Sequence, residues 1–140
     1  MKKYRFFQHT ADAKFQAYGQ TLEEAFQHAA LAVASLMWNW KRIDQKTEVP
    51  VQVDGRDLKQ LLVNFLEEIL YLLDTRSFLL SQVENIAIRR KNSLYILQAI
   101  FKGDEYSSDY EISGDVKAIT YNEMVIRENA PCMVQVVADI

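Results

Sequence analysis

Two stretches of the chain carry hydrophobic side chains at the spacing of an α-helix. In the first stretch, from Leu22 to Met37, apolar side chains recur at every third or fourth position, and polar side chains fall largely on the other faces. Thr21 and Glu24 have the spacing of a capping box, in which the Thr hydroxyl and the Glu carboxylate bind backbone N–H groups at a helix start. The pattern predicts a helix that runs from this box to about Trp38.

The second helical stretch is more hydrophobic than the first. Asp57, followed three residues later by Gln60, predicts its start, and the polar segment 74–77 predicts its exit. Its apolar side chains, between Leu58 and Leu73, occupy more than half of the helix circumference. Because so wide an apolar surface must be covered on two sides, we expect this helix to lie centrally and to contact both a sheet and the first helix.

The rest of the chain has the alternation of apolar and polar positions that is typical of β-strands. The predicted strands span residues 3–8, 14–18, 47–53, 83–90, 93–102, 105–112, 123–127 and 133–138. Turn-forming residues separate several of them, at 91–92, 103–104 and 129–131, which predicts antiparallel hairpins in the second half. The expected fold class is α+β, with two amphipathic helices packed on a largely antiparallel β-sheet and strands supplied by both ends of the chain.

The size and composition of the chain fit a single domain that spans residues 1–140. A chain of 140 residues with 49% hydrophobic and 25% charged residues has the balance of a globular protein. The apolar segment 58–73 is interrupted by polar and charged residues that a bilayer core would penalise. The first residues reach Gln8 and His9 before any apolar run has the length of a signal peptide. We therefore expect neither a membrane span nor export.

The charge of the chain bears on its partners, and its cysteine content bears on its compartment. The formal net charge is -3. This argues against a dedicated nucleic-acid binder, because such domains usually carry a basic excess that displaces counterions from phosphates. Any contact with RNA is therefore expected to run through a partner protein. Cys132 is the only cysteine, which excludes an intramolecular disulfide and a thiolate cluster for structural zinc, and a reducing, cytoplasmic setting is the simplest one.

Two acidic residues stand out by their positions at strand ends. Asp12 follows the first predicted strand, and Asp139 ends the last one beside the terminal carboxylate of Ile140. If the first and last strands are neighbours, these oxygen groups converge into a set that suits hard divalent cations such as Mg, Mn or Ca. Alternatively, Asp12 caps a turn through its side chain and Asp139 is solvated at the terminus. From these residues alone the second interpretation is the better one, because Asp usually lies at the surface.

Four segments of the chain are informative both for their residues and for the order in which they occur along the sequence. They are the opening segment with His9-Thr10-Ala11-Asp12, Gly19, Thr21–Phe26 and Ala29-Ala30, then Leu70–Thr75, then Val116–Tyr121, and finally Val136–Ile140. In content and in order these segments resemble the signatures of the archease family. Together they span essentially the whole chain.

The resemblance implies a protein cofactor of an RtcB-class RNA ligase, a GTP-dependent enzyme that seals RNA ends in tRNA splicing and RNA repair. It also implies a divalent metal site formed by Asp12, Asp139 and the terminal residue Ile140, in agreement with the oxygen ligands described above. Ca, Mg and Mn all suit such ligands. Lys117 matches a lysine that is implicated in the family's function. The chain is thus expected to be an activator rather than an enzyme, and to meet RNA only through the ligase.

Two further residues of the matched segments, Lys117 and His9, have more than one possible role. Lys117 is expected to contact a phosphate or a carboxylate of the ligase, although a lysine at a strand end is more often a solvated charge. His9 can act as a metal ligand, a general base or a structural hydrogen-bonding group, and we favour the structural role. Asn122 departs from the family, which commonly has His after Thr-Tyr, and segment 129–133 departs from its usual turn.

Two other functions would use the same residues or surfaces differently. A free-standing, metal-dependent phosphohydrolase would use the carboxylates with a bound water, but the sequence has no catalytic triad, glycine-rich phosphate loop or dense His/Asp cluster. A chaperone-like modulator of tRNA-modifying enzymes would act through exposed apolar surface and would survive loss of Asp12 or Asp139. The ligase cofactor remains the expected function.

Overall fold

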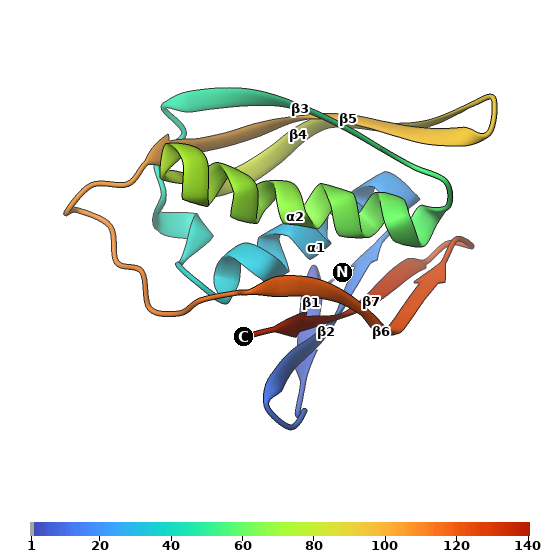
Figure 1. The fold of residues 1–140 in the computed structure, drawn as a ribbon, viewed down its shortest axis with the longest axis horizontal. Coiled ribbons are helices and arrows are strands. Elements are labelled where there is room, and N and C mark those ends of the chain that lie inside the picture. Colours follow the sequence, from blue (N-terminus) through green and yellow to red (C-terminus); the bar gives the residue numbers. More distant parts are fainter. Residues whose placement is uncertain (1) are drawn as a thin grey trace.

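The structure of the protein, a computed structural model, describes residues 2–140. Along this part of the chain the elements follow one another as β1 (Tyr4–Phe7), β2 (Asp12–Gly19), α1 (Leu22–Ser35), the short 3-10 helix η1 (Trp40–Arg42), β3 (Thr47–Gly55), α2 (Leu58–Arg76), β4 (Phe78–Lys91), β5 (Leu94–Glu105), β6 (Ala118–Arg127) and β7 (Cys132–Asp139) (Figure 1). The predicted α+β class is confirmed.

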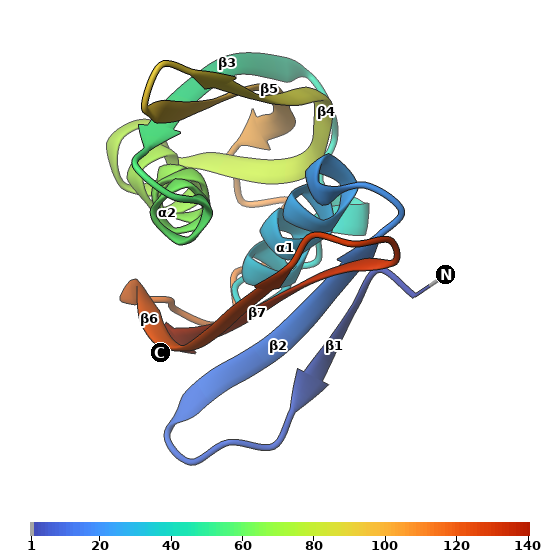
Figure 2. The same ribbon diagram turned by 90° about the vertical axis from the view of Figure 1, so that its right-hand side faces the viewer.

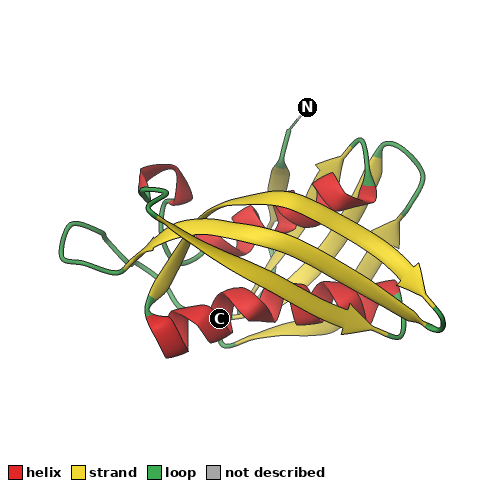
Figure 3. Cartoon of the chain, turned by 90° about the horizontal axis from the view of Figure 1, so that it is seen from above, coloured by secondary structure: helices red, strands yellow, loops and turns green. Residues whose placement is uncertain are grey.

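The strands of residues 2–140 form two sheets, where the sequence predicted one. A four-stranded sheet has the order β1-β2-β7-β6, and a three-stranded sheet has the order β3-β5-β4. All of their pairings are antiparallel. The two helices lie between the sheets (Figure 2), and seen from above the three-stranded sheet covers them (Figure 3). The number of sheets depends on pairing between distant segments, which the alternation within each strand does not encode.

Both helices begin where their capping residues predict. At α1, Thr21 Oγ1 accepts a hydrogen bond from the Glu24 N–H at 3.1 Å, and Glu24 Oε1 accepts one from the Gln20 N–H at 2.9 Å. Asp57 and Gln60 make the corresponding bonds at α2. Helix α1 ends at Ser35, earlier than predicted, because the next residues tighten into turns whose N–H groups bind carbonyls three residues back.

The core is built around α2, as its wide apolar surface predicts. The helix contacts β3 on one side, β6 on the other, and α1 beside it. Phe65 of α2 stacks on Phe26 of α1 with 6.1 Å between ring centroids, and it meets Phe101 of β5 edge-on at 5.6 Å. All three rings are fully buried. The four-stranded sheet packs against the same helices, because α1 contacts β2 and β7 and α2 contacts β6. Within residues 2–140, neither helix has the length and apolar character that crossing a membrane requires.

The predicted strand 105–112 is wrong. Residues 106–117 instead form an irregular segment that connects the three-stranded sheet to the four-stranded sheet across the side of the helices (Figure 1). Three backbone hydrogen bonds tie it to other parts of the chain. The Tyr106 N–H donates to the Ser77 carbonyl at 2.8 Å, the Ser113 N–H to the Met37 carbonyl at 2.8 Å, and the Lys117 N–H to the Asp139 carbonyl at 2.7 Å. A segment that must cross between layers cannot stay in either ladder.

The predicted turn at residues 103–104 is also wrong, because β5 continues through it to Glu105. Gly103 lies opposite Leu80, beside an irregularity in the register of β4 and β5. A Cβ atom at this position would come within 2.0 Å of the Leu79 carbonyl oxygen. The glycine therefore marks a close approach of two backbones inside a strand rather than a chain reversal. The other two predicted turns, at residues 91–92 and 129–131, do connect paired strands.

Candidate functional site

Asp12 and Asp139 meet at one end of the four-stranded sheet. Asp12 is the first residue of β2, Asp139 is the last residue of β7, and the two lie directly opposite each other in the antiparallel ladder. The neighbour of the last strand is thus the second strand, not the first, and Asp12 opens that strand rather than following β1. The next pair in the ladder, Ala13 and Ala138, is buried toward the helices. Because side chains alternate along a strand, both Asp side chains lie on the outer face of the sheet.

Opposite positions in an antiparallel ladder place two Cβ atoms roughly 4.5–5.5 Å apart, and like charges there are destabilising. Asp12 is about one-third exposed, with 31% of its side-chain surface accessible, and Asp139 is exposed. Ile140, the third residue expected at this site, follows Asp139 directly and is exposed. The two Asp side chains supply oxygen ligands, which is the chemistry of a site for a hard divalent cation. Within residues 2–140 no three His, Cys, Asp or Glu side chains are already grouped as a metal site, so the two Asp side chains do not form a complete site by themselves.

Lys117 lies beside this pair. Its backbone N–H donates a hydrogen bond to the Asp139 carbonyl at 2.7 Å, and the next residue, Ala118, is the ladder partner of Asp139. The Lys117 side chain is exposed, while Val116 and Ile119 on either side are buried and anchor the chain. Three neighbouring strands, β2, β7 and β6, thus bring the predicted residues to one end of the sheet.

His9, in the loop before β2, contacts two acidic side chains. Its Nε2 lies 2.9 Å from Glu123 Oε2, and its Nδ1 lies 3.8 Å from Asp12 Oδ2. Glu123 also accepts a hydrogen bond from Lys14 Nζ at 3.0 Å. The hydrogen bond with His9, followed by the hydrogen bond and the positive charge of Lys14, lowers the pKa of Glu123. Glu123 is therefore ionised at neutral pH and held by two partners.

Glu123 is a residue of this site that the sequence did not single out. It lies in a bulge of β6 between Thr120 and Val125, where the register with β7 shifts, and its φ of 52° is in the left-handed region. Gln135 Nε2 donates to the Glu123 carbonyl at 2.7 Å and holds the bulge down. Asn122 lies in the same bulge. Alternation alone predicts an ordinary strand here, so a single sequence carries no signal for this placement.

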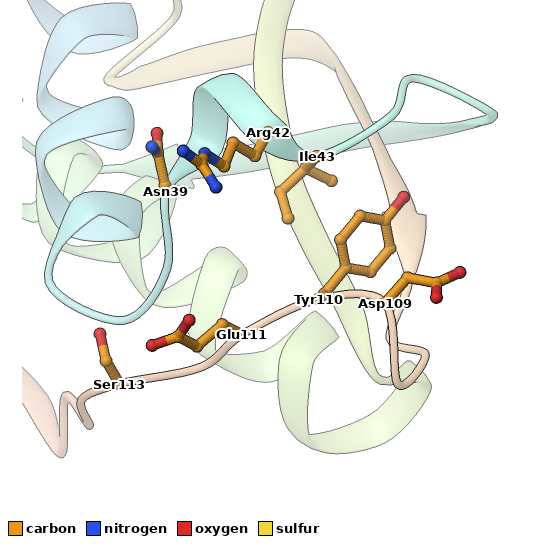
Figure 4. A pocket seen from close by; sticks show the side chains of 7 residues that line it. All are labelled: Asn39, Arg42, Ile43, Asp109, Tyr110, Glu111 and Ser113. Atoms are coloured by element: carbon orange, nitrogen blue, oxygen red, sulfur yellow. The ribbon is translucent and has the colours of Figure 1, made fainter.

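A separate cleft of about 320 Å³ lies between η1 and segment 106–117 (Figure 4). Its side chains come from Asn39, Arg42, Ile43, Asp109, Tyr110, Glu111 and Ser113. Tyr110 closes one side, where its hydroxyl donates to Asp104 Oδ2 at 2.6 Å and accepts from the Asp44 N–H at 3.2 Å. The hydrogen bond to Asp104 raises the pKa of Tyr110 to about 12. The residues of the sheet end do not line this cleft.

The chain is similar to known proteins over its whole length. A sequence profile of the archease protein family matches residues 4–140. The archease of Pyrococcus furiosus is 38% identical, with 100% of both chains covered, and the archease of Methanosarcina mazei is 36% identical over 99% of this chain and 97% of its own. The solution structure of protein 1598 of Methanobacterium thermoautotrophicum matches with a TM-score of 0.87 and 33% identity, covering 100% of each chain.

Proposed function

The chain belongs to the archease family, and from that premise we propose that it is a protein cofactor that activates an RtcB-class, GTP-dependent RNA ligase. The proposed activation depends on a divalent metal ion held by Asp12, Asp139 and the Ile140 carboxylate. The observation that supports this most is the direct opposition of Asp12 and Asp139 in the ladder of β2 and β7. The same residues are the ones that the family resemblance implies as ligands.

The residues at the sheet end fit a hard divalent cation such as Ca, Mg or Mn. Two carboxylates that face each other across a ladder repel, and a cation between them removes that repulsion. When bound beside the active site of the ligase, such an ion would help to neutralise the charge of a nucleoside triphosphate during guanylylation of the ligase. The role of this chain is to present the carboxylates on a rigid sheet end where a partner can approach them.

Lys117 has a supporting role in this proposal. Its backbone is fixed to the Asp139 carbonyl, whereas its side chain extends from an exposed position. An ammonium group placed there suits a phosphate of the nucleotide or a carboxylate on the surface of the ligase. The net charge of -3 leaves the contact with RNA to the ligase. We propose that this chain and the ligase work together in the cytoplasm, in tRNA splicing or RNA repair.

The proposal is tested by single substitutions that keep size and remove charge. Asp12→Asn and Asp139→Asn should fold normally in metal-free buffer, because relief of repulsion between opposed like charges is worth roughly 0.2–1 kcal/mol in favour of the variant. Both should lose stimulation of GTP-dependent guanylylation of the cognate ligase, measured as covalent GMP on the ligase. Asp54→Asn is the matched control, since Asp54 is exposed on β3 of the other sheet.

The outcomes of this experiment also separate the competing functions. Full stimulation by both variants would contradict the proposal and favour a modulator that acts by binding alone. Metal-dependent hydrolysis of nucleotides or phosphoesters by the purified chain, without ligase, would favour a phosphohydrolase. Loss of stimulation by Asp54→Asn as well would mean that the assay responds to surface charge in general.

A further inference from the structure

His9 has one ring nitrogen that is buried and unused. Its Nδ1 is shielded from solvent and makes no hydrogen bond within residues 2–140, although a quarter of the side-chain surface of His9 is accessible. The distance of 3.8 Å to Asp12 Oδ2 is too long for a hydrogen bond. A buried polar atom without a partner is costly and therefore rare in native proteins, and where one persists it can mark the place of a bound ion.

The other ring nitrogen of His9 fixes the protonation pattern of the ring. Nε2 lies 2.9 Å from Glu123 Oε2, and an ionised carboxylate can only accept hydrogen bonds. Nε2 therefore carries the proton, and in a neutral ring the lone pair lies on Nδ1, on the side of Asp12. Histidines that bind metals have this arrangement, in which the second ring N–H is donated to a carboxylate.

The backbone around Glu123 is built to hold its carboxylate in this place. A left-handed φ of 52° is strained for a residue with a side chain, and such strain is retained where the surrounding structure enforces it. Lys14 and Gln135 both bind Glu123, through its carboxylate and its carbonyl respectively. Bulges next to functional sites commonly re-aim a side chain, and this one directs Glu123 to His9.

We propose that His9 is a further ligand of the metal ion, through Nδ1, and that Glu123 is the positioning residue that orients its ring. This inference rests on the proposed function, because it concerns the same ion as Asp12 and Asp139. It deepens that function by naming the class of metal. An imidazole ligand favours first-row transition cations over Mg²⁺ and Ca²⁺, which prefer oxygen alone. The preference is strongest for Zn²⁺ and weaker for Mn²⁺, which also accepts oxygen ligands.

The distance between His9 Nδ1 and Asp12 Oδ2 is close to the distance between two ligand atoms of one metal ion. Two ligand atoms that each lie about 2.1 Å from a metal are separated by roughly 3.0–3.6 Å, so the observed 3.8 Å requires an approach of a few tenths of an ångström. His9 lies in a loop whose turn is made by Ala11 in the left-handed region, with φ 62°. Asp139, exposed at the end of β7, reaches the ion by rotation of its side chain.

The first test uses the fact that the chain has only two histidines, His9 and His28. His28 Nδ1 lies 2.6 Å from the Tyr18 carbonyl, so His28 serves as an internal reference. We expect addition of Zn²⁺ to the ¹⁵N-labelled full chain to shift the Nδ1 resonance of His9 and leave His28 unchanged, whereas Mg²⁺ produces no such shift. An unchanged His9 resonance when calorimetry shows a saturated site would overturn the inference.

The second test measures metal affinity directly by calorimetry, with Mn²⁺ and with Mg²⁺, for His9→Gln and Glu123→Gln. Loss of a carboxylate that orients a metal-binding histidine typically lowers metal affinity about 10–100-fold. We therefore expect Glu123→Gln to lose Mn²⁺ affinity by that factor and to lose much less Mg²⁺ affinity. His9→Gln should lose at least as much. Glu111→Gln, an exposed carboxylate on segment 106–117, is the matched control and should bind as the unmodified chain does.

The affinity results distinguish failure of this inference from failure of the proposed function. Metal binding that needs Asp12 and Asp139 but is unaffected in His9→Gln and Glu123→Gln would refute the role of His9 alone. Equal weakening of Mn²⁺ binding and Mg²⁺ binding in both variants would also refute it, because the substitutions would then act on the shape of the site and not on a nitrogen ligand. No binding of either metal by the unmodified chain would refute both.

Discussion

At the scale of single residues, the carboxylates of the site differ little from other surface acids in exposure. What distinguishes Asp12 and Asp139 is their position directly opposite each other in a ladder. Glu123 differs in another way, because two hydrogen bonds hold its carboxylate and lower its pKa. The site thus combines one carboxylate that two partners already hold with that of Asp12, whose contact with His9 is longer, at 3.8 Å.

The pair formed by Asp104 and Tyr110 makes part of the stability depend on pH. The hydrogen bond from Tyr110 lowers the pKa of Asp104 below its usual 3.8, and it raises the pKa of Tyr110 from 10.0 to about 12. The contribution of Asp104 to the free energy of unfolding is therefore present above pH 3.8, and it is lost as the pH falls through the lowered pKa of Asp104. The Tyr110 contribution is present below pH 10 and is lost as the pH rises toward 12.

Tyr110→Phe should accordingly lower the free energy of unfolding at neutral pH, because it removes this bond and the bond from the Asp44 N–H. The difference from the unmodified chain should shrink at both pH extremes, as followed by urea denaturation across the pH range. Tyr106→Phe is the control, because Tyr106 is an exposed side chain at the start of the same segment. A difference that stays constant from acid to alkaline pH would contradict this account.

At the scale of elements, helix α2 ends on a residue in an unfavourable backbone conformation. Ser77 caps the helix in the left-handed region with φ 51°, where glycine has no steric cost. Ser77→Gly should therefore raise the free energy of unfolding by about 1 kcal/mol. Ser35→Gly, at the last residue of α1, should instead lower it by about 0.5–1 kcal/mol, because glycine inside a helix costs conformational entropy. Chemical denaturation measures both, and a loss of stability in Ser77→Gly would contradict the prediction.

The elements also show which parts of the fold a sequence can predict. Both helix starts were predicted from two residues each, because a capping box is complete within four positions of the chain. The exit of α2 near Ser77 and the turns after β4 and β6 were predicted for the same reason, since they are set by local residues. Part of segment 106–117 was wrongly predicted as a strand. The chain has to cross here from one sheet to the other, and its local residues do not indicate that crossing.

The candidate site was predicted only as far as it depends on strand ends. Asp12 and Asp139 stood out by their places at the ends of predicted strands, but the expectation of a metal site came from the family resemblance. Their meeting depends on β2 lying next to β7, which no local pattern encodes. Glu123 was not predicted because its position depends on a bulge that is held by Gln135 of the neighbouring strand. The roles of these residues toward a metal remain predictions.

At the scale of the whole molecule, the helices between the sheets separate the core from the site. The helices lie between the two sheets (Figure 2), and the core residues of both sheets pack against them. Asp12 and Asp139 lie on the other face of the four-stranded sheet, by the alternation of side chains along β2 and β7. A sheet backed by a packed helical layer keeps its strand ends in fixed positions. This arrangement suits a protein that presents a preformed end of a sheet to a larger enzyme.

We propose above all that the chain, through this end of the sheet, lets an RtcB-class ligase turn over repeatedly. The most direct measurement is GTP-dependent RNA ligation by the cognate ligase with RNA in large excess over enzyme, with and without the purified chain. We expect the ligase alone to stop after about one round and to continue through many rounds when the unmodified chain is present, but not when Asp139→Asn replaces it. An identical time course with and without the unmodified chain would contradict the account.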